Sequence, residues 1–302
     1  MSTVRPTLSR TAHDRAAHRR TDEKWLVEAW PTARVLTVDA GGFAPVQHTA
    51  ETAELVFTSG AEVDPALPRT FLGEGDGVVY FSVPGERGDD WESLRITAGS
   101  LDDLGAGLMA CAVALAAWHA SHTHCPRCGA PTEPVSAGWS TRCTNDGSMH
   151  FPRTDPAVIM LIHDGADKCV LGRGEAWPTG RFSILAGFVE AGESAEAAVV
   201  REVDEEVGLA VTDVRYVASQ PWPFPASLML GYTALGDSTQ PVVLQDGELA
   251  EAGWFSRDEI RAARVWGSDS ENWPAQWPTP LRALPGNASI ANAILTQWLA
   301  EG

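Results

Sequence analysis

The chain has 302 residues, 44% of them hydrophobic, and a formal net charge of −18 at pH 7. This length accommodates two domains and a small insert, and the hydrophobic fraction is sufficient for a core in each domain. The negative charge argues against nonspecific adhesion to nucleic acids or to anionic membrane surfaces.

Residues 1–22 are rich in arginine but have no apolar run behind these charges, so they do not resemble a secretory signal. We expect them to form a flexible tail. Short strand-like runs follow at residues 55–57 and 78–83, separated by Gly and Asp turns, and a helical run covers residues 101–119. These patterns predict an N-terminal α+β domain over residues 23–121. No run reaches the length of a membrane-spanning helix.

The next segment, residues 122–153, carries three of the chain's five cysteines at a spacing typical of metal sites: Cys125, Cys128 and Cys143. A zinc ribbon has a second C-x2-C pair, whose last cysteine would fall at position 146, where this chain has Asp146. The fourth ligand is therefore Asp146 or His150, or else the metal is lost. Because structural zinc sites mix ligand types, we predict a zinc-ribbon-like segment with bound zinc. Cysteines in this pattern fit a reducing compartment, and we expect a cytoplasmic protein.

The remaining residues, 154–302, alternate between strand patterns and helix patterns, which predicts an α/β domain. The strands are expected at residues 157–162, 169–172, 214–218 and 228–234, with a closing helix at residues 289–299.

One stretch of this domain, residues 187–209, reads GFVEAGESAEAAVVREVDEEVGL. It fills every fixed position of the pattern G-x5-E-x7-R-E-U-x-E-E-x-G-U, in which U is an aliphatic residue. Ser194 is a typical helix N-cap, the alanines behind it favour helix, and Gly208 stands where a helix ends. A solvated acidic helix face, the ordinary alternative, explains neither Gly187 nor the spacing.

On that helix Glu202, Glu205 and Glu206 share one face, because they lie three and four positions apart. Clustered carboxylates repel one another unless a cation joins them, and hard oxygen ligands suit Mg2+ or Mn2+. Arg201 can hold a carboxylate through a two-pronged hydrogen bond, and we predict Glu193 as its partner. The stretch therefore predicts a divalent-metal site.

Residues 219–227 read SQPWPFPAS and form a second motif. Three prolines fix the backbone and limit ladder pairing, so we predict a stiff loop that carries Trp222 and Phe224. A rigid loop with aromatic faces and polar ends can line a pocket for a flat dinucleotide. The alternative is a structural crossover whose aromatic rings pack in a core.

Residues 187–209 match the Nudix box, and SQPWPFPxS resembles the array that marks the NADH pyrophosphatase branch of the Nudix hydrolases. With the ribbon, the resemblance covers about residues 95–300. It implies a Nudix α/β/α sandwich over residues 154–302 and metal-dependent hydrolysis of the pyrophosphate bond of NADH or NAD to NMN(H) and AMP. It also implies removal of NAD caps from RNA 5′ ends and a homodimeric assembly.

The resemblance also assigns roles to individual residues near the box. Glu202 and Glu206 match the family's metal-binding carboxylates, with Ala186 lending a backbone carbonyl. Glu206 is expected to orient or deprotonate the attacking water. Glu248 matches a distant acidic ligand, for which Glu251 is the near alternative. The predicted catalytic group is Arg201, Glu202, Glu205 and Glu206.

Substrate contacts follow from the same resemblance. Phe151 matches an aromatic residue that contacts the base, and Phe188 can face it across a stacking slot. Ala291 matches a backbone contact and Arg95 a substrate arginine. A glutamate that the family carries between its cysteine pairs is Gly138 here. The predicted substrate-binding set is Arg95, Phe151, Phe188, Gln220, Pro221, Trp222, Pro223, Phe224, Pro225, Ala226, Ser227 and Ala291.

Two other functions remain as alternatives. One is a Nudix hydrolase of ADP-ribose or another nucleoside diphosphate derivative, against which the loop at residues 219–227 argues. The other is a noncatalytic Nudix-like regulator that binds a ligand. Such a regulator would not need the carboxylates and would usually carry a basic DNA-binding segment, which this chain does not show.

Overall fold

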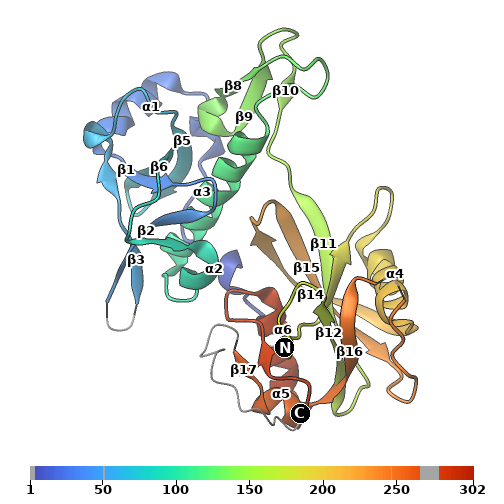
Figure 1. The fold of residues 1–302 in the computed structure, drawn as a ribbon. Coiled ribbons are helices and arrows are strands. Elements are labelled where there is room, and N and C mark those ends of the chain that lie inside the picture. Colours follow the sequence, from blue (N-terminus) through green and yellow to red (C-terminus); the bar gives the residue numbers. More distant parts are fainter. Residues whose placement is uncertain (1–3, 50–51, 246, 266–278) are drawn as a thin grey trace. The chain divides into compact units, whose positions relative to one another are not determined.

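The computed structural model describes residues 4–49, 52–245, 247–265 and 279–302. The chain forms two compact units, which we call the N-terminal and the C-terminal unit (Figure 1). The expected boundary between residues 153 and 154 lies one residue from the observed one. The N-terminal unit comprises Leu8–Thr154 and Pro221–Ser227, and the C-terminal unit comprises Met1–Thr7, Asp155–Gln220 and Leu228–Gly302.

Two small sheets build most of the N-terminal unit, with the strand orders β4-β1-β6-β5 and β3-β2-β7. Strands β5 and β6 form a hairpin whose two turn residues, Asp76 and Gly77, both have positive φ, as tight hairpin turns require. The strands are β1 Arg34–Val38, β2 Phe43–His48, β3 Ala53–Leu55, β4 Thr58–Ser59, β5 Thr70–Gly75, β6 Val78–Pro84 and β7 Trp91–Ser93. The helices are α1 Glu23–Ala29, α2 Leu94–Thr97 and α3 Asp103–Ser121.

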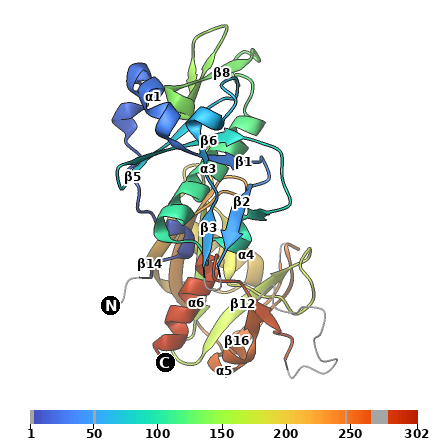
Figure 2. The ribbon, with the colours of Figure 1, turned by 90° about the vertical axis from the view of Figure 1, so that its left-hand side faces the viewer.

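Helix α3 is the core helix of this unit and packs against β1, β5 and β6 (Figure 2). The carboxylate of Asp102 caps it by accepting a hydrogen bond from Gly105 N–H at 2.6 Å. By length and composition alone, this helix is long and apolar enough to cross a membrane. The expectation that no run reaches the length of a membrane-spanning helix was therefore wrong. In the structure its central residues Leu108, Met109 and Ala112 are fully buried, and this explains its apolar composition.

The segment expected to be a flexible tail is packed in its described part, residues 4–22. Leu8 and Ala16 are buried. The guanidinium of Arg20 stacks over Trp139, with 3.5 Å between its central carbon and the ring centroid. These contacts correct the expectation of a flexible tail, since arginines that find aromatic partners can order a segment that has few apolar residues.

The ribbon is a three-stranded antiparallel sheet of order β10-β9-β8. It belongs to the N-terminal unit and is not a compact unit by itself. Its strands are β8 Thr132–Val135, β9 Ser140–Cys143 and β10 Met149–His150.

Gly138 lies between β8 and β9, where the family carries a glutamate. It has a φ of 88°, and its carbonyl oxygen lies 2.8 Å from Nε2 of His119. A Cβ at this position would lie 2.6 Å from Oγ1 of Thr70. The local backbone therefore favours glycine and leaves no room for a longer side chain unless Thr70 moves.

Six strands form the main sheet of the C-terminal unit, in the order β14-β15-β11-β12-β16, with β13 paired to β11. Strand β11 is antiparallel to β12 and β13, and β12 is antiparallel to β16. The strands are β11 Asp155–His163, β12 Lys168–Gly174, β13 Leu185–Phe188, β14 Val211–Trp222, β15 Ser227–Gly236, β16 Leu249–Ser256 and the short parallel pair β17 Arg264–Val265 and β18 Ala283–Leu284. The helices are α4 Ala195–Val207, α5 Arg257–Ala262 and α6 Ile290–Ala300.

The side chains of β11 alternate between two cores. Val158, Met160 and Ile162 join a core with the buried residues of α4, whereas Ile159 and Leu161 join a core with those of α6. The two helices thus cover opposite faces of the sheet (Figure 1). A strand that is buried on both faces needs apolar residues at every position, which is the pattern in the sequence. The predicted α/β/α sandwich is confirmed.

Candidate functional site

The Nudix box folds as the strand β13, a turn and the helix α4. The hydroxyl oxygen of Ser194 accepts a hydrogen bond from Ala197 N–H at 3.2 Å and so caps the helix. Gly208 ends the helix in the left-handed conformation, with a φ of 66°. The start and end expected from the sequence are therefore both found.

Gly187 allows the strand and the helix to approach closely. A Cβ at this position would lie 1.9 Å from Cδ of Glu202 and 2.1 Å from its Oε2. The Glu202 carboxylate thus lies directly against the backbone of β13, and any side chain at position 187 would displace it. Ala186, whose carbonyl is the predicted metal ligand, precedes Gly187 on this strand.

Arg201 binds the acidic residues of the box together. Its Nε and Nη2 donate to the two carboxylate oxygens of Glu193 at 2.9 and 2.8 Å, which is the predicted two-pronged pair. Its Nη1 donates to Glu202 and to Glu205, each at 2.9 Å. Its Nη2 also donates to the carbonyl oxygen of Phe188 at 2.9 Å. The guanidinium, which has five N–H donors, therefore makes five hydrogen bonds.

These contacts move the pKa values of two carboxylates in opposite directions. Hydrogen bonds from Arg201 lower the pKa of Glu193 to about 2. Burial raises the pKa of Glu202 against the opposing effect of Arg201, and the charges of Glu205 and Glu248 raise it further. The site therefore gathers negative charge that one arginine does not neutralise, and a divalent cation with oxygen ligands fits this donor set.

Glu206 and Glu248 complete the acidic group. Glu206 is 3% exposed and lies on the same helix as Glu202. Glu248 is close enough for its charge to raise the pKa of Glu202. Glu251 instead forms an ion pair with Arg173, whose Nη2 lies 2.8 Å from its Oε1. The effect of Glu248 on the Glu202 carboxylate fits the role predicted for it as the distant acidic ligand.

The SQPWPFPAS stretch spans the end of β14 and the start of β15, because β14 runs to Trp222 and β15 begins at Ser227. Only residues 223–226 form the turn between them, so the predicted loop is shorter than expected, since Pro221 is accommodated in the strand. The rings of Trp222 and Phe224 pack edge to face, with centroids 5.0 Å apart and an interplanar angle of 78°. The guanidinium carbon of Arg95 lies 4.1 Å from the centroid of Phe224 and 5.2 Å from that of Trp222. The structure thus brings three of the predicted substrate residues together, within the N-terminal unit.

Gln220 is buried at the end of β14. Its side chain is fully buried, and its Nε2 donates to the carbonyl oxygen of Ala288 at 3.1 Å. This bond ties β14 to the residues that lead into α6. Its predicted substrate contact stays a prediction. The sequence did not show this burial, because a glutamine in a polar motif gives no sign of it.

The other predicted substrate residues are found in different surroundings. Phe151 and Phe188 are 69% and 60% exposed. They belong to different units, and the stacking slot between them stays a prediction. Ala291 is buried in the first turn of α6, where its N–H donates to Oγ of Ser289 at 3.2 Å.

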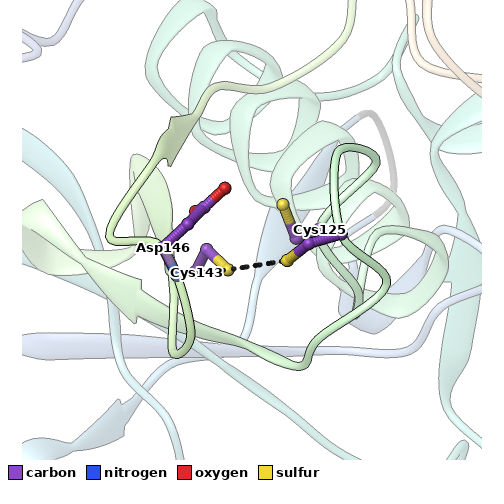
Figure 3. A group of neighbouring side chains, drawn as sticks. Cys125, Cys143 and Asp146 are labelled. Carbon is purple, nitrogen blue, oxygen red and sulfur yellow. Dashed lines mark hydrogen bonds between the residues drawn. The ribbon is translucent and has the colours of Figure 1, made fainter.

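Four ligand atoms converge in the ribbon, from Cys125, Cys128, Cys143 and Asp146. Figure 3 labels three of these residues, Cys125, Cys143 and Asp146. All of them lie within 4.8 Å of one another. The Sγ atoms of Cys128 and Cys143 are 3.5 Å apart. Two thiolates on a tetrahedral zinc, with Zn–S bonds of about 2.3 Å, are about 3.8 Å apart. The donor set therefore fits zinc with little rearrangement.

Sequence reasoning missed two interactions of the site. The ion pair between Arg201 and Glu205 could have been predicted from the sequence, because opposite charges four residues apart on a helix lie next to each other. The ion pair between Arg173 and Glu251 could not have been predicted from the sequence. It depends on the register of β12 against β16, which places these two residues opposite each other.

Comparison with known proteins gives matches over nearly the whole chain. The NUDIX domain family matches residues 153–275, and the NADH pyrophosphatase zinc ribbon domain matches residues 120–151. The chain is 43% identical to the NAD-capped RNA hydrolase NudC of Mycobacterium bovis, over 98% of this chain and 95% of that protein. The corresponding protein of Mycobacterium tuberculosis is 42% identical over the same shares. The NAD-capped RNA hydrolase NUDT12 of Homo sapiens is 37% identical over 64% of this chain and 42% of that protein.

Proposed function

Because this chain belongs to the NAD-capped RNA hydrolases of the Nudix family, we propose that it hydrolyses the pyrophosphate bond of NADH or NAD to NMN(H) and AMP. We propose that it also removes NAD caps from RNA 5′ ends, since the cap contains the same bond. The observation that carries this proposal is the complete Nudix box, folded with its carboxylates gathered against β13, in a chain 43% identical to a NAD-capped RNA hydrolase.

The catalytic cation that we propose is Mg2+ or Mn2+. Glu202, Glu206 and Glu248 would hold it through carboxylate oxygens, with the carbonyl of Ala186. Bound there, it would neutralise pyrophosphate oxygens and lower the pKa of a water molecule. The support for this is the donor set, which consists of oxygen atoms and carries more negative charge than Arg201 neutralises.

The chain's own residues then have distinct tasks. Glu206 orients the attacking water or accepts its proton, and its burial limits the positions that this carboxylate can take. Arg201 is a positioning residue, because it fixes Glu193, Glu202 and Glu205 at once. Its bond to the Phe188 carbonyl also fixes the helix against the strand. The pyrophosphate bridge is cleaved, and the redox state of the nicotinamide plays no part.

Recognition of the dinucleotide is a separate task. Trp222 and Phe224 offer aromatic surface for a ring of the substrate, and Arg95 lies over both rings with a positive charge. A base that stacks on an aromatic side chain gains about 1–3 kcal/mol. Phe151 and Phe188 offer two further exposed rings, for which the predicted stacking slot remains our proposal.

The ribbon zinc serves structure in this proposal, since its ligands come from turns of a small sheet. We also propose a homodimer, as the family resemblance implies, and a cytoplasmic setting. Thiols at metal-binding spacing support the latter, because they need a reducing environment to remain ligands.

A side-by-side turnover assay tests the proposed function. Purified protein is given Mg2+ or Mn2+ with NADH, NAD+, NAD-capped RNA or ADP-ribose, and the products are separated by chromatography. We expect NMNH or NMN with AMP from the dinucleotides and a chelator-sensitive rate. Faster turnover of ADP-ribose than of every NAD substrate would support the alternative hydrolase. If the protein binds one of these compounds but turns over none of them, the noncatalytic regulator would be supported.

Light scattering tests the proposed homodimer, and a monomer mass would refute it.

A further inference from the structure

The ribbon has only three cysteines where its family pattern has four, and the structure assigns the missing ligand. We infer that Asp146 closes the ribbon zinc site, so that zinc is held by three thiolates and one carboxylate, and that Ser148 and His150 hold this carboxylate from outside. This inference concerns the ligand set of one metal and does not depend on which substrate the enzyme hydrolyses.

The first argument is the placement of Asp146. It lies three residues after Cys143, the spacing at which a zinc knuckle presents its second ligand. The backbone N–H groups of Asn145 and Asp146 both donate to Sγ of Cys143 at 3.4 Å, so the turn wraps around that sulfur. The carboxylate of Asp146 points into the cluster, because its oxygen and the three cysteine sulfur atoms all lie within 4.8 Å of one another.

The second argument is the support behind the carboxylate. Oδ1 of Asp146 accepts hydrogen bonds from the N–H of Ser148 at 2.9 Å and from its Oγ at 2.5 Å. Groups that bind a metal-ligating carboxylate from behind fix its orientation and are a regular part of metal sites.

The third argument concerns His150, the other candidate. Its Nε2 lies 3.2 Å from Oγ of Ser148, and the described ligand atoms that converge within 4.8 Å do not include it. His150 therefore continues the chain of contacts that starts at Asp146 and passes through Ser148. This arrangement makes His150 a positioning residue for the ligand and not a ligand itself.

An oxygen ligand changes the properties of the site. Zinc binds thiolates strongly, and a carboxylate in place of the fourth thiolate gives a weaker bond. Asp146→Cys restores four sulfur ligands and should slow the release of zinc to a chelator. Asp146→Ala should weaken zinc binding about 100-fold or more, since even residues that only contact a ligand contribute about 10- to 100-fold.

The test uses the full chain, reduced and reconstituted with Co2+, which reports its ligands through visible and near-ultraviolet absorption. We expect a tetrahedral spectrum with three thiolates in the wild type, and thiolate absorption about 1.3-fold higher in Asp146→Cys, the ratio of four sulfurs to three. His150→Gln should keep the wild-type spectrum, and Glu133→Ala, a ribbon carboxylate paired with Arg142, is the matched control. Zinc content and chelator competition are measured alongside.

Three results would overturn the inference. The first is a spectrum that changes in His150→Gln but not in Asp146→Ala, which would make His150 the ligand. The second is equal metal affinity in Asp146→Ala and the wild type. The third is well-folded wild-type protein without metal and with a disulfide between Cys128 and Cys143. None of these measurements uses NADH, so their outcome is separate from that of the turnover assay.

Discussion

The box in the C-terminal unit and the ribbon in the N-terminal unit both gather ligand atoms, but they hold them in different ways. In the box, the carboxylates lie on a capped helix whose other face is buried, and Arg201 supplies an internal cation. In the ribbon, Cys125 and Cys128 precede β8, Cys143 ends β9, and Asp146 lies in the turn before β10, with Cys128 exposed. We therefore expect the box to keep its shape without a cation and the ribbon to depend on zinc.

We therefore expect the two proposed metals to contribute differently to folding. The carboxylate cluster is assembled by side chains that pair with each other, so removal of the catalytic cation should leave the helix in place. The ribbon has a small core, and structural zinc contributes folding free energy directly. The predictions below test this contrast, beginning with the largest expected effect.

Loss of zinc should be the most damaging change. Cys128→Ser should reduce the zinc content from about one per chain to none and should lower the melting temperature of the protein, since structural zinc contributes about 10 kcal/mol or more in isolated zinc fingers. Elemental analysis and calorimetry measure this, with Cys111→Ser, a buried cysteine outside the ribbon, as a control for zinc content. Zinc-free protein with an unchanged melting temperature would show that the ribbon folds without metal.

A substitution in the box should remove activity and leave the fold intact, whereas loss of a zinc ligand should lower stability. Glu206→Gln should lower kcat about 100- to 10,000-fold, as expected for a residue that handles the proton of the attacking water. Its melting temperature should remain near that of the wild type. Steady-state kinetics and circular dichroism check both points. Glu196→Gln, on the same helix, is the control that should stay active, and near-normal turnover of Glu206→Gln would remove Glu206 from the mechanism.

A smaller effect should separate recognition from catalysis. Trp222→Ala and Phe224→Ala should each reduce kcat/KM for NADH about 10- to 100-fold, which corresponds to the loss of one stacked ring. The reduction for ADP-ribose should be smaller, because in our proposal the rings bind a base of the dinucleotide and not its pyrophosphate. The test is to measure kcat/KM for NADH and for ADP-ribose in each variant, together with the melting temperature of each variant. Equal reductions accompanied by lower stability would mean that the rings are scaffold only.

The smallest effect concerns pH. The pKa of Glu193 is lowered from 4.5 to about 2 by its bonds to Arg201. The stability from this pair is therefore present above pH 4.5 and is lost as the pH falls through about 2. Glu193→Gln should flatten the dependence of stability on pH between these values, as measured by denaturant unfolding. Glu190→Gln, three residues earlier, is the control and should leave the dependence unchanged.

Local patterns predicted much of this molecule. The caps at Ser194 and Gly208 and the pair between Arg201 and Glu193 depend on spacing within one short stretch, and all were found. The packing of residues 4–22 and the burial of Gln220 were not predicted, because they depend on partners far along the chain. Sequence spacing also left Asp146 and His150 open, and the two candidates are separated by the convergence of Asp146 with the three thiols and by the position of Ser148 between Asp146 and His150.

The segment from Pro221 to Ser227 has a consequence for fragments of this protein and for domain exchange. Its flanking strands belong to the C-terminal unit, but the loop itself clusters with the N-terminal unit, where Arg95 lies over its two rings. A fragment that starts at Asp155 would retain every carboxylate of the box and lose the arginine that accompanies the aromatic loop. Gene fusion or domain exchange at that boundary would thus transfer the box carboxylates without Arg95 and its contacts to the two rings.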